Sequence, residues 1–182
     1  MQPQPLAALC HRRWAVPVLA ELDRTGGARF TALARGLGIS RESLRRTLDD
    51  LVDGGLVRRN PGHGHPLRPE YLPTAEGRRL GPACRKLVGA LERLGAVDVG
   101  LRKWSLPVAL ALGHDARGFA RVRARVGDIT DRALAQALRA LEDADLVRRR
   151  LLDARPPRTA YRLTRRARPL VPILEALHGG RR

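Results

Sequence analysis

The side chains with the clearest chemical potential in this sequence are arginines that stand in short clusters. Lysines and arginines number 35 against 18 aspartates and glutamates, which gives the 182-residue chain a formal net charge of +17. A guanidinium group can hold a phosphate or the edge of a guanine with two parallel hydrogen bonds. The charge therefore indicates a polyanionic partner, either a nucleic acid or an anionic membrane surface, and argues against a generic soluble enzyme.

The composition excludes several classes of protein. Hydrophobic residues make up 43% of the chain, which is enough for a packed core and excludes a disordered polybasic tail. Aromatic residues make up only 3%, so we do not expect a protein that stacks single-stranded bases on aromatic side chains. The sequence has no phosphate-binding glycine loop, nucleophile elbow or paired carboxylates suited to acid–base chemistry. We therefore expect neither an enzyme nor a bound cofactor.

The sequence also carries expectations about the compartment and about metals. The longest apolar stretch, residues 106–112, is far shorter than the ~20 residues of a membrane-spanning helix, and the N-terminus does not resemble a signal peptide. We therefore expect a cytoplasmic protein without a membrane partner. Cys10 and Cys84 are either inert thiols or a redox pair brought together by terminal helices. His63 and His65 lack a nearby carboxylate or cysteine, so no metal site is expected.

The arginine clusters recur because the sequence repeats itself. A shift by 90 residues, from Trp14 to Trp104, superimposes two long stretches of the chain. Residues 12–14 and 56–59 then fall on 102–104 and 146–149 with nearly the same residue types. Between Phe30 and Gly38 a shift of 89 fits better. The chain therefore consists of two copies of one unit, which we assign to residues 1–95 and 96–182.

The hydrophobic pattern of each copy predicts three helices followed by a β-hairpin. In the third helix of the first copy, Leu44, Leu48 and Leu51 form one apolar stripe, and Ser40 is a suitable N-cap. We expect helices in the first copy over about 14–23, 30–36, 40–53 and 74–94, and strands over 56–59 and 70–72. The second copy repeats this order, with helices from Trp104, Phe119 and Thr130, strands at Leu146 and Tyr161, and a last helix after Thr164.

This order of elements is that of a winged helix-turn-helix. The fold class that we expect is mainly α with small β-hairpins (α+β), with two tandem winged helix-turn-helix domains in a pseudo-twofold arrangement. The second copy resembles the HxlR branch of the MarR-like bacterial regulators over nearly all of residues 102–178. The resemblance rests on Lys103-Trp104, Phe119, residues 127–130, Leu134, Leu138, Leu141, residues 146–149 and 156–158, Tyr161 and residues 163–164. Residues 12–94 resemble the family more loosely.

The resemblance implies a regulator of transcription. Family members are usually single-domain homodimers, whereas this chain carries two units in tandem. The redox branch of the family places a cysteine well upstream of the Lys-Trp pair. Cys10 lies only four residues before Trp14 in this sequence, so redox sensing is not carried over.

The third helix of such a domain enters the major groove and leads with its N-terminal residues. The residues that we predict to contact DNA from the two third helices are Ser40, Arg41, Glu42, Arg45, Arg46, Thr130, Arg132, Ala135, Gln136 and Arg139. Asp131 in the same helix would repel phosphate. The alternative is a solvated helix face with ion pairs between residues four positions apart. These alternative pairs are Arg45 with Asp49, Arg46 with Asp50 and Arg139 with Asp143.

The hairpins, or wings, and the second helix of the second copy carry further arginines. We predict that Arg58, Arg59, Arg68, Arg121, Arg148, Arg149, Arg150, Arg155 and Arg158 contact the DNA backbone or minor groove. Such contacts give affinity more than sequence choice. The alternative is a charge run that only meets solvent.

We therefore expect a sequence-specific regulator that binds double-stranded DNA as a monomer with an internal pseudo-dimer. Further dimerisation and a small-molecule effector remain open. Trp14 and Trp104 are expected to pack in the core, with the lining of a ligand pocket as the alternative. The other functions that fit the sequence are a protein-interaction scaffold of tandem winged helices and a small-molecule-sensing or resistance protein.

Overall fold

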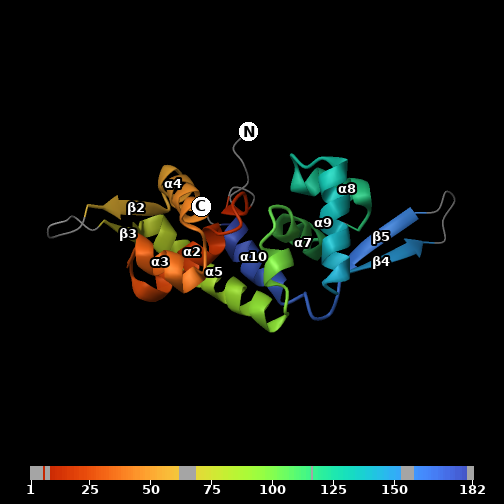
Figure 1. The fold of residues 1–182 in the computed structure, drawn as a ribbon. Helices are drawn as coiled ribbons and strands as arrows, with labels where there is room; N and C mark the ends of the chain where they lie inside the picture. Colours follow the sequence, from red (N-terminus) through yellow and green to blue (C-terminus); the bar gives the residue numbers. More distant parts are fainter. Residues whose placement is uncertain (1–5, 7–8, 62–68, 116, 153–157, 180–182) are drawn as a thin grey trace.

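The computed structural model describes residues 6, 9–61, 69–115, 117–152 and 158–179. The chain is mainly helical with small antiparallel hairpins, which confirms the expected fold class. Figure 1 shows an elongated molecule in which the two hairpins project from opposite ends. The helices α5 and α10 lie between the two halves in the same view.

The first copy contains the predicted elements and one additional strand. Its elements are α2 (Ala15–Thr25), β1 (Ala28–Arg29), α3 (Phe30–Leu37), α4 (Arg41–Asp53), β2 (Val57–Asn60), β3 (Glu70–Pro73) and α5 (Ala75–Arg93). Strand β1 was not predicted, because two residues are too few to show a periodic pattern. It pairs with β3, which also pairs with β2 in an antiparallel sheet.

The second copy follows the same order with a short helix before it. Its elements are α6 (Val97–Gly100), α7 (Ser105–Gly113), α8 (Phe119–Val126), α9 (Asp131–Asp143), β4 (Val147–Leu152), β5 (Arg158–Leu163) and α10 (Leu170–His178). The equivalent of β1 is reduced to a single bridge between Gly118 and Ala160.

The last helix of the second copy begins later than the sequence indicated, unlike that of the first copy. In the first copy, Thr74 Oγ1 accepts a hydrogen bond from Gly77 N at 3.1 Å, so α5 begins directly after it. In the second copy, Thr164 Oγ1 donates to the carbonyl of Asp145, and turns occupy residues 165–169. Helix α10 therefore begins only at Leu170.

The leucine stripes of the two third helices form the centre of each half. Leu44, Leu48 and Leu51 of α4 are buried, as the 4-and-3 spacing predicted. The corresponding leucines of α9, Leu134, Leu138 and Leu141, are buried as well. Helix α7 is buried along almost its whole length, from Ser105 to Leu112. Its position in the interior explains the apolar stretch in the sequence.

The two halves meet mainly through α5 and α10. Helix α5 packs against α2 of its own copy and against α10 of the other copy. Gly100 lets α6 approach α5, because a Cβ at this position would lie 2.5 Å from Leu91 Cδ2. Polar contacts also join the halves: Arg13 forms an ion pair with Asp98, and Arg166 donates to the carbonyl of Leu94 at 2.6 Å.

Candidate nucleic-acid interface

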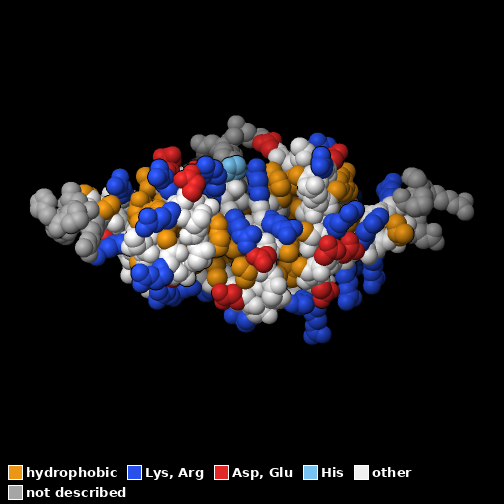
Figure 2. All heavy atoms as spheres, in the orientation of Figure 1, with side chains coloured by type: hydrophobic (Ala, Val, Ile, Leu, Met, Phe, Trp, Pro, Cys, Tyr) orange, Lys and Arg blue, Asp and Glu red, His pale blue; other side chains and the backbone are white. Residues whose placement is uncertain are grey.

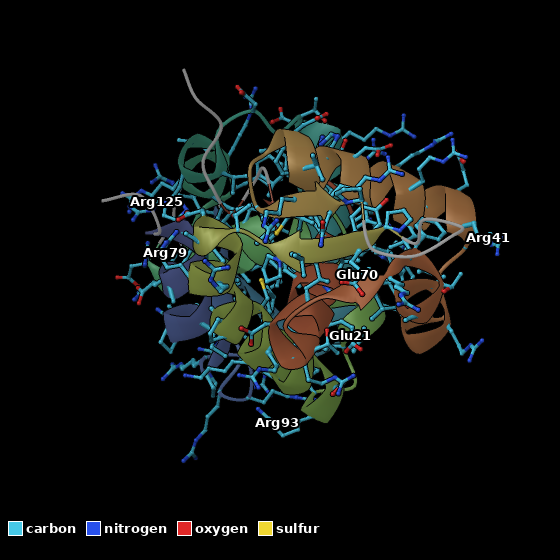
Figure 3. The ribbon with its side chains drawn as sticks, turned by 90° about the vertical axis from the view of Figure 1, so that its left-hand side faces the viewer. Glu21, Arg41, Glu70, Arg79, Arg93 and Arg125 are labelled. Carbon is cyan, nitrogen blue, oxygen red and sulfur yellow. The ribbon has the colours of Figure 1, made fainter. Side chains whose placement is uncertain are left out.

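The N-terminus of α4 is exposed to solvent and is capped by Ser40. Gly38 adopts a left-handed conformation with φ of 60°, which allows the tight turn between α3 and α4. Ser40 Oγ then accepts a hydrogen bond from Ser43 N at 3.3 Å. Figure 3 shows Arg41 at this end of α4, projecting away from the body of the protein. The turn and the cap thus present the first residues of α4 at the surface.

Two arginines of α4 are free to meet a partner. Arg41 and Arg45 are exposed and form no ion pair within the described part of the chain. Arg46 instead pairs with Glu42, with 2.7 Å between Nε and Oε1. Asp50, the alternative partner of Arg46, binds Arg12 from the segment before α2. The alternative ion pairs Arg45–Asp49 and Arg46–Asp50 are therefore wrong, since the structure joins other residues.

The corresponding residues of α9 have a different set of partners. Thr130 Oγ1 accepts a hydrogen bond from Ala133 N at 3.2 Å and caps the helix. Asp131, which we expected to repel phosphate, lies 3.1 Å from Arg123 Nε of α8. The guanidinium group of Arg123 therefore places a positive charge beside this carboxylate. The other predicted contact residues of α9 are exposed: Arg132, Ala135, Gln136 and Arg139. In the described residues Arg139 has no ion pair with Asp143.

The hairpins add a second cationic surface to each half. The predicted arginines that the structure describes here are all exposed: Arg58, Arg59, Arg148, Arg149, Arg150 and Arg158, together with Arg121 of α8. Arg68 and Arg155 lie outside the described residues, as do His63 and His65. Figure 2 shows Lys and Arg side chains along the full length of one face, with fewer acidic side chains among them.

The sequence reasoning missed one arginine of the second hairpin. Arg162 is exposed on β5, and its partner in the strand register is Arg148 of β4. Two like charges opposite each other in a sheet are unfavourable unless an anion lies between or above them. The sequence of β5 could have identified Arg162, because its direct neighbours Tyr161 and Leu163 are apolar and successive side chains of a strand point to opposite faces.

The two tryptophans lie at the edge of the core. Trp14 and Trp104 are half-buried and pack against buried residues, as expected. Each is covered by the basic residue before it: Arg13 lies 5.6 Å from the Trp14 ring centre, and Lys103 Nζ lies 4.8 Å from that of Trp104. Trp104 also lines a cavity of about 630 Å³ along one side of α9.

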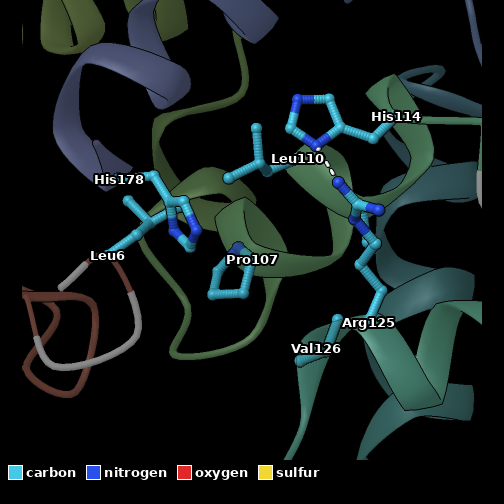
Figure 4. A pocket seen from close by; sticks show the side chains of 8 residues that line it. Leu6, Pro107, Leu110, His114, Arg125, Val126 and His178 are labelled. Carbon is cyan, nitrogen blue, oxygen red and sulfur yellow. Dashed lines mark hydrogen bonds between the residues drawn. The ribbon is translucent and has the colours of Figure 1, made fainter. Parts of the chain in front are cut away.

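A smaller cavity of about 230 Å³ lies between α7, α8 and α10. Figure 4 shows Leu6 and His178 on one side of it and His114 and Arg125 on the other. Arg125 donates to Nδ1 of His114 at 2.7 Å, so the imidazole carries its proton on Nε2, which lies 2.7 Å from Glu175. This chain of polar contacts joins three helices and serves the packing of the second copy.

The two cysteines are free thiols in the interior. Cys10 and Cys84 are buried and not joined by a disulfide. Burial raises the pKa of Cys10 to about 12 and also raises the pKa of Cys84, because a thiolate is poorly solvated there. A reactive cysteine needs a lowered pKa and access to solvent. The environment therefore favours inert thiols over a redox pair.

The described residues contain no helix that is long and apolar enough to cross a membrane, and no cluster of three or more His, Cys, Asp or Glu that could hold a metal ion. What the arrangement offers chemically is a set of guanidinium groups on two capped helices and two hairpins. That set can bind the phosphate groups of a nucleic acid and the hydrogen-bonding edges of its bases.

These helices and hairpins define the class of the winged helix-turn-helix proteins. Within that class, the chain belongs to the HxlR-like helix-turn-helix family, whose model matches residues 9–95 and again residues 99–179. The double match agrees with the repeat seen in the sequence and with the resemblance drawn from it.

Three relatives have similar sequences over part of the chain. An uncharacterised HTH-type transcriptional regulator of Methanothermobacter thermautotrophicus is 34% identical over 94 residues, which cover 50% of this chain and 72% of the relative. One of Halalkalibacterium halodurans is 36% identical over 76 residues, covering 41% and 67% of the two chains. One of Mycobacterium bovis is 43% identical over 72 residues, covering 40% and 45%. Each match is about the length of one copy.

Proposed function

We propose that this protein is a sequence-specific regulator of transcription that binds double-stranded DNA and acts as a single-chain pseudo-dimer. The observation that carries the proposal is the presence of two capped third helices in one chain, each with exposed arginines that have no ion-pair partner among the described residues. Arg41 and Arg45 fill this role in α4, and Arg132 and Arg139 fill it in α9. Membership of a family of helix-turn-helix proteins supports it.

The contact between α5 and α10 supports the pseudo-dimer. Each belongs to a different copy, residues 1–95 or 96–182, and each follows the hairpin of that copy. Their packing joins the two units as a subunit interface would join two chains. The protein would then bind one duplex without a partner subunit.

The two copies offer different chemistry to a base pair. Helix α4 presents arginines, which favour guanine, whereas α9 also presents Gln136, which favours adenine. A homodimer has identical recognition helices and reads a palindrome. This chain has two unlike helices, so its two half-sites would differ in sequence.

Gel mobility shifts with the protein's own promoter region test the proposal. We expect a specific complex of one chain per duplex whose affinity falls steeply between about 50 and 200 mM salt. The stoichiometry is measured by sedimentation of the complex. Two chains per duplex would contradict the pseudo-dimer, and binding that is insensitive to salt or indifferent to sequence would contradict the regulator. Capture of a protein partner after nuclease treatment, without any DNA binding, would favour an interaction scaffold.

A further inference from the structure

The cavity beside Trp104 lies between the start of α7, α6 and one side of α9. Its volume of about 630 Å³ is in the range of pockets that hold small organic ligands. Four alanines of α9 and its C-terminal end form one wall: Ala133, Ala137, Ala140 and Ala144. Trp104 and Val99 contribute further apolar surface.

In the first copy an ion pair spans the equivalent position. Arg12 and Asp50 occupy the positions that Arg102 and Ala140 occupy in the second copy. Arg12 Nε donates to Asp50 Oδ2 at 2.5 Å and so joins the segment before α2 to α4. In the second copy, the alanine removes the acceptor, and Arg102 has no ion-pair partner within the described residues. The cavity therefore exists where one copy lacks the bond that the other has.

A buried hydroxyl in the cavity wall also lacks a partner. Ser105 is 1% exposed, and its Oγ has no hydrogen-bond partner in the part of the chain that is described. The equivalent residue of the first copy is Ala15, so the fold does not need a hydroxyl at this position. Buried polar atoms in folded proteins nearly always have a partner. The hydroxyl is thus available to a ligand that enters the cavity.

The charges around the cavity select an anion. Arg102, Lys103 and Arg139 line it against one acidic residue, Asp143. A ligand that fits both the charge and the apolar wall carries one negative group on a flat hydrophobic body. We propose that the cavity binds a small aromatic carboxylate, with its ring against Trp104 and the alanines of α9 and its carboxylate towards Arg102 and the Ser105 hydroxyl.

The same cavity reaches residues that we assign to DNA recognition. Gln136 and Arg139 line it and are also predicted base contacts. A bound carboxylate would bring a negative charge into the cavity that Arg139 lines and reduce the attraction of Arg139 to DNA, so ligand and DNA would weaken each other's binding. This coupling rests on the proposed DNA-binding function, whereas binding of the carboxylate alone does not.

Calorimetry of the full chain with 1-naphthoate, in the absence of DNA, tests the site. We expect one binding site, and quenching of Trp104 fluorescence in a Trp14→Phe variant. Ala140→Asp restores the acceptor of the first copy and should weaken binding by about tenfold or more. The matched control is Asp50→Ala, which removes the Arg12–Asp50 ion pair of the first copy and should leave binding at the second copy unchanged.

Two further measurements keep the test decisive. Ala140→Leu fills the cavity without adding a charge and should also weaken 1-naphthoate binding. It replaces Ala140→Asp in the experiment if that variant does not fold. The cation 1-naphthylmethylammonium should bind at least about tenfold more weakly than 1-naphthoate. Absence of 1-naphthoate binding, equal binding of the cation, or binding that survives both Ala140 variants would overturn the proposal. Loss of DNA binding in gel shifts with intact 1-naphthoate binding would overturn only the DNA function.

Discussion

Arg123 of α8 places its Nε 3.1 Å from the carboxylate of Asp131 in the first turn of α9. An acidic residue at this position stabilises the start of the helix through the helix dipole. It also brings a negative charge to a surface that we propose for phosphate. In the first copy, the equivalent residues are Ala34 and Arg41, so the cation there stands on the third helix itself. The second copy supplies it from the neighbouring helix.

The ion pair predicts how Arg123→Ala changes DNA binding. The variant leaves Asp131 uncompensated, so we expect affinity to fall about two- to fivefold, which is the range of an exposed ion pair. In the background of Asp131→Asn the same substitution should cost less, because no carboxylate remains to repel phosphate. Gel shifts with the two single variants and the double variant measure this coupling. Equal effects of Arg123→Ala in both backgrounds would show that Arg123 acts on the DNA alone.

The difference between the two third helices predicts separate effects on the two half-sites. Arg45→Ala should weaken contacts in one half-site, and Arg132→Ala should weaken contacts in the other, each by about 1–3 kcal/mol if the side chain binds a base edge. Footprinting of each variant on one operator shows which half loses protection. The same loss on every DNA sequence would instead identify both side chains as phosphate contacts.

Most of the fold could be predicted because its signals are local. The spacing of Leu44, Leu48 and Leu51 identified the buried side of α4, and the capping residues Ser40 and Thr130 gave the start of each third helix. The repeat allowed each copy to support the assignment of the other. Strand β1 was missed because it has only two residues, and its pairing with β3 is a tertiary contact.

The partners of the charged side chains could not be predicted for the same reason. The sequence indicated Asp50 as a partner for Arg46, four residues away. The structure instead pairs Asp50 with Arg12, 38 residues away. Nothing in a local pattern distinguishes these two partners, because the choice depends on how α4 packs against the segment before α2. The cavity of the second copy lies where this contact is missing, and a local pattern does not predict it either.

The second hairpin predicts a loss of affinity without a loss of specificity. Arg148 and Arg162 are paired in the strand register and exposed, so both are expected to lie along the phosphate backbone. Arg148→Ala and Arg162→Ala should each reduce the slope of log affinity against log salt by about 1 and weaken all sequences alike. The slope is measured by titrations at several salt concentrations. A change in sequence preference would place these arginines at base edges instead.

The buried thiols predict both a chemical inertness and a dependence of stability on pH. Burial raises the pKa of Cys10 to about 12, well above the ~8.5 of a thiol in the unfolded chain. The folded state therefore keeps a proton that the unfolded state loses, so the contribution to stability is complete below about pH 8.5 and declines as the pH rises towards 12. The raised pKa of Cys84 acts in the same direction.

Urea unfolding between about pH 8 and pH 10 measures this decline. Cys84→Ala removes one of the two thiols and should make the decline shallower, which separates the effect from the titration of tyrosine and lysine. Iodoacetamide should modify neither cysteine in the folded protein and both in the unfolded protein, as read by mass spectrometry. Rapid modification of Cys10 or Cys84 under native conditions would contradict the inert assignment and would revive the redox pair.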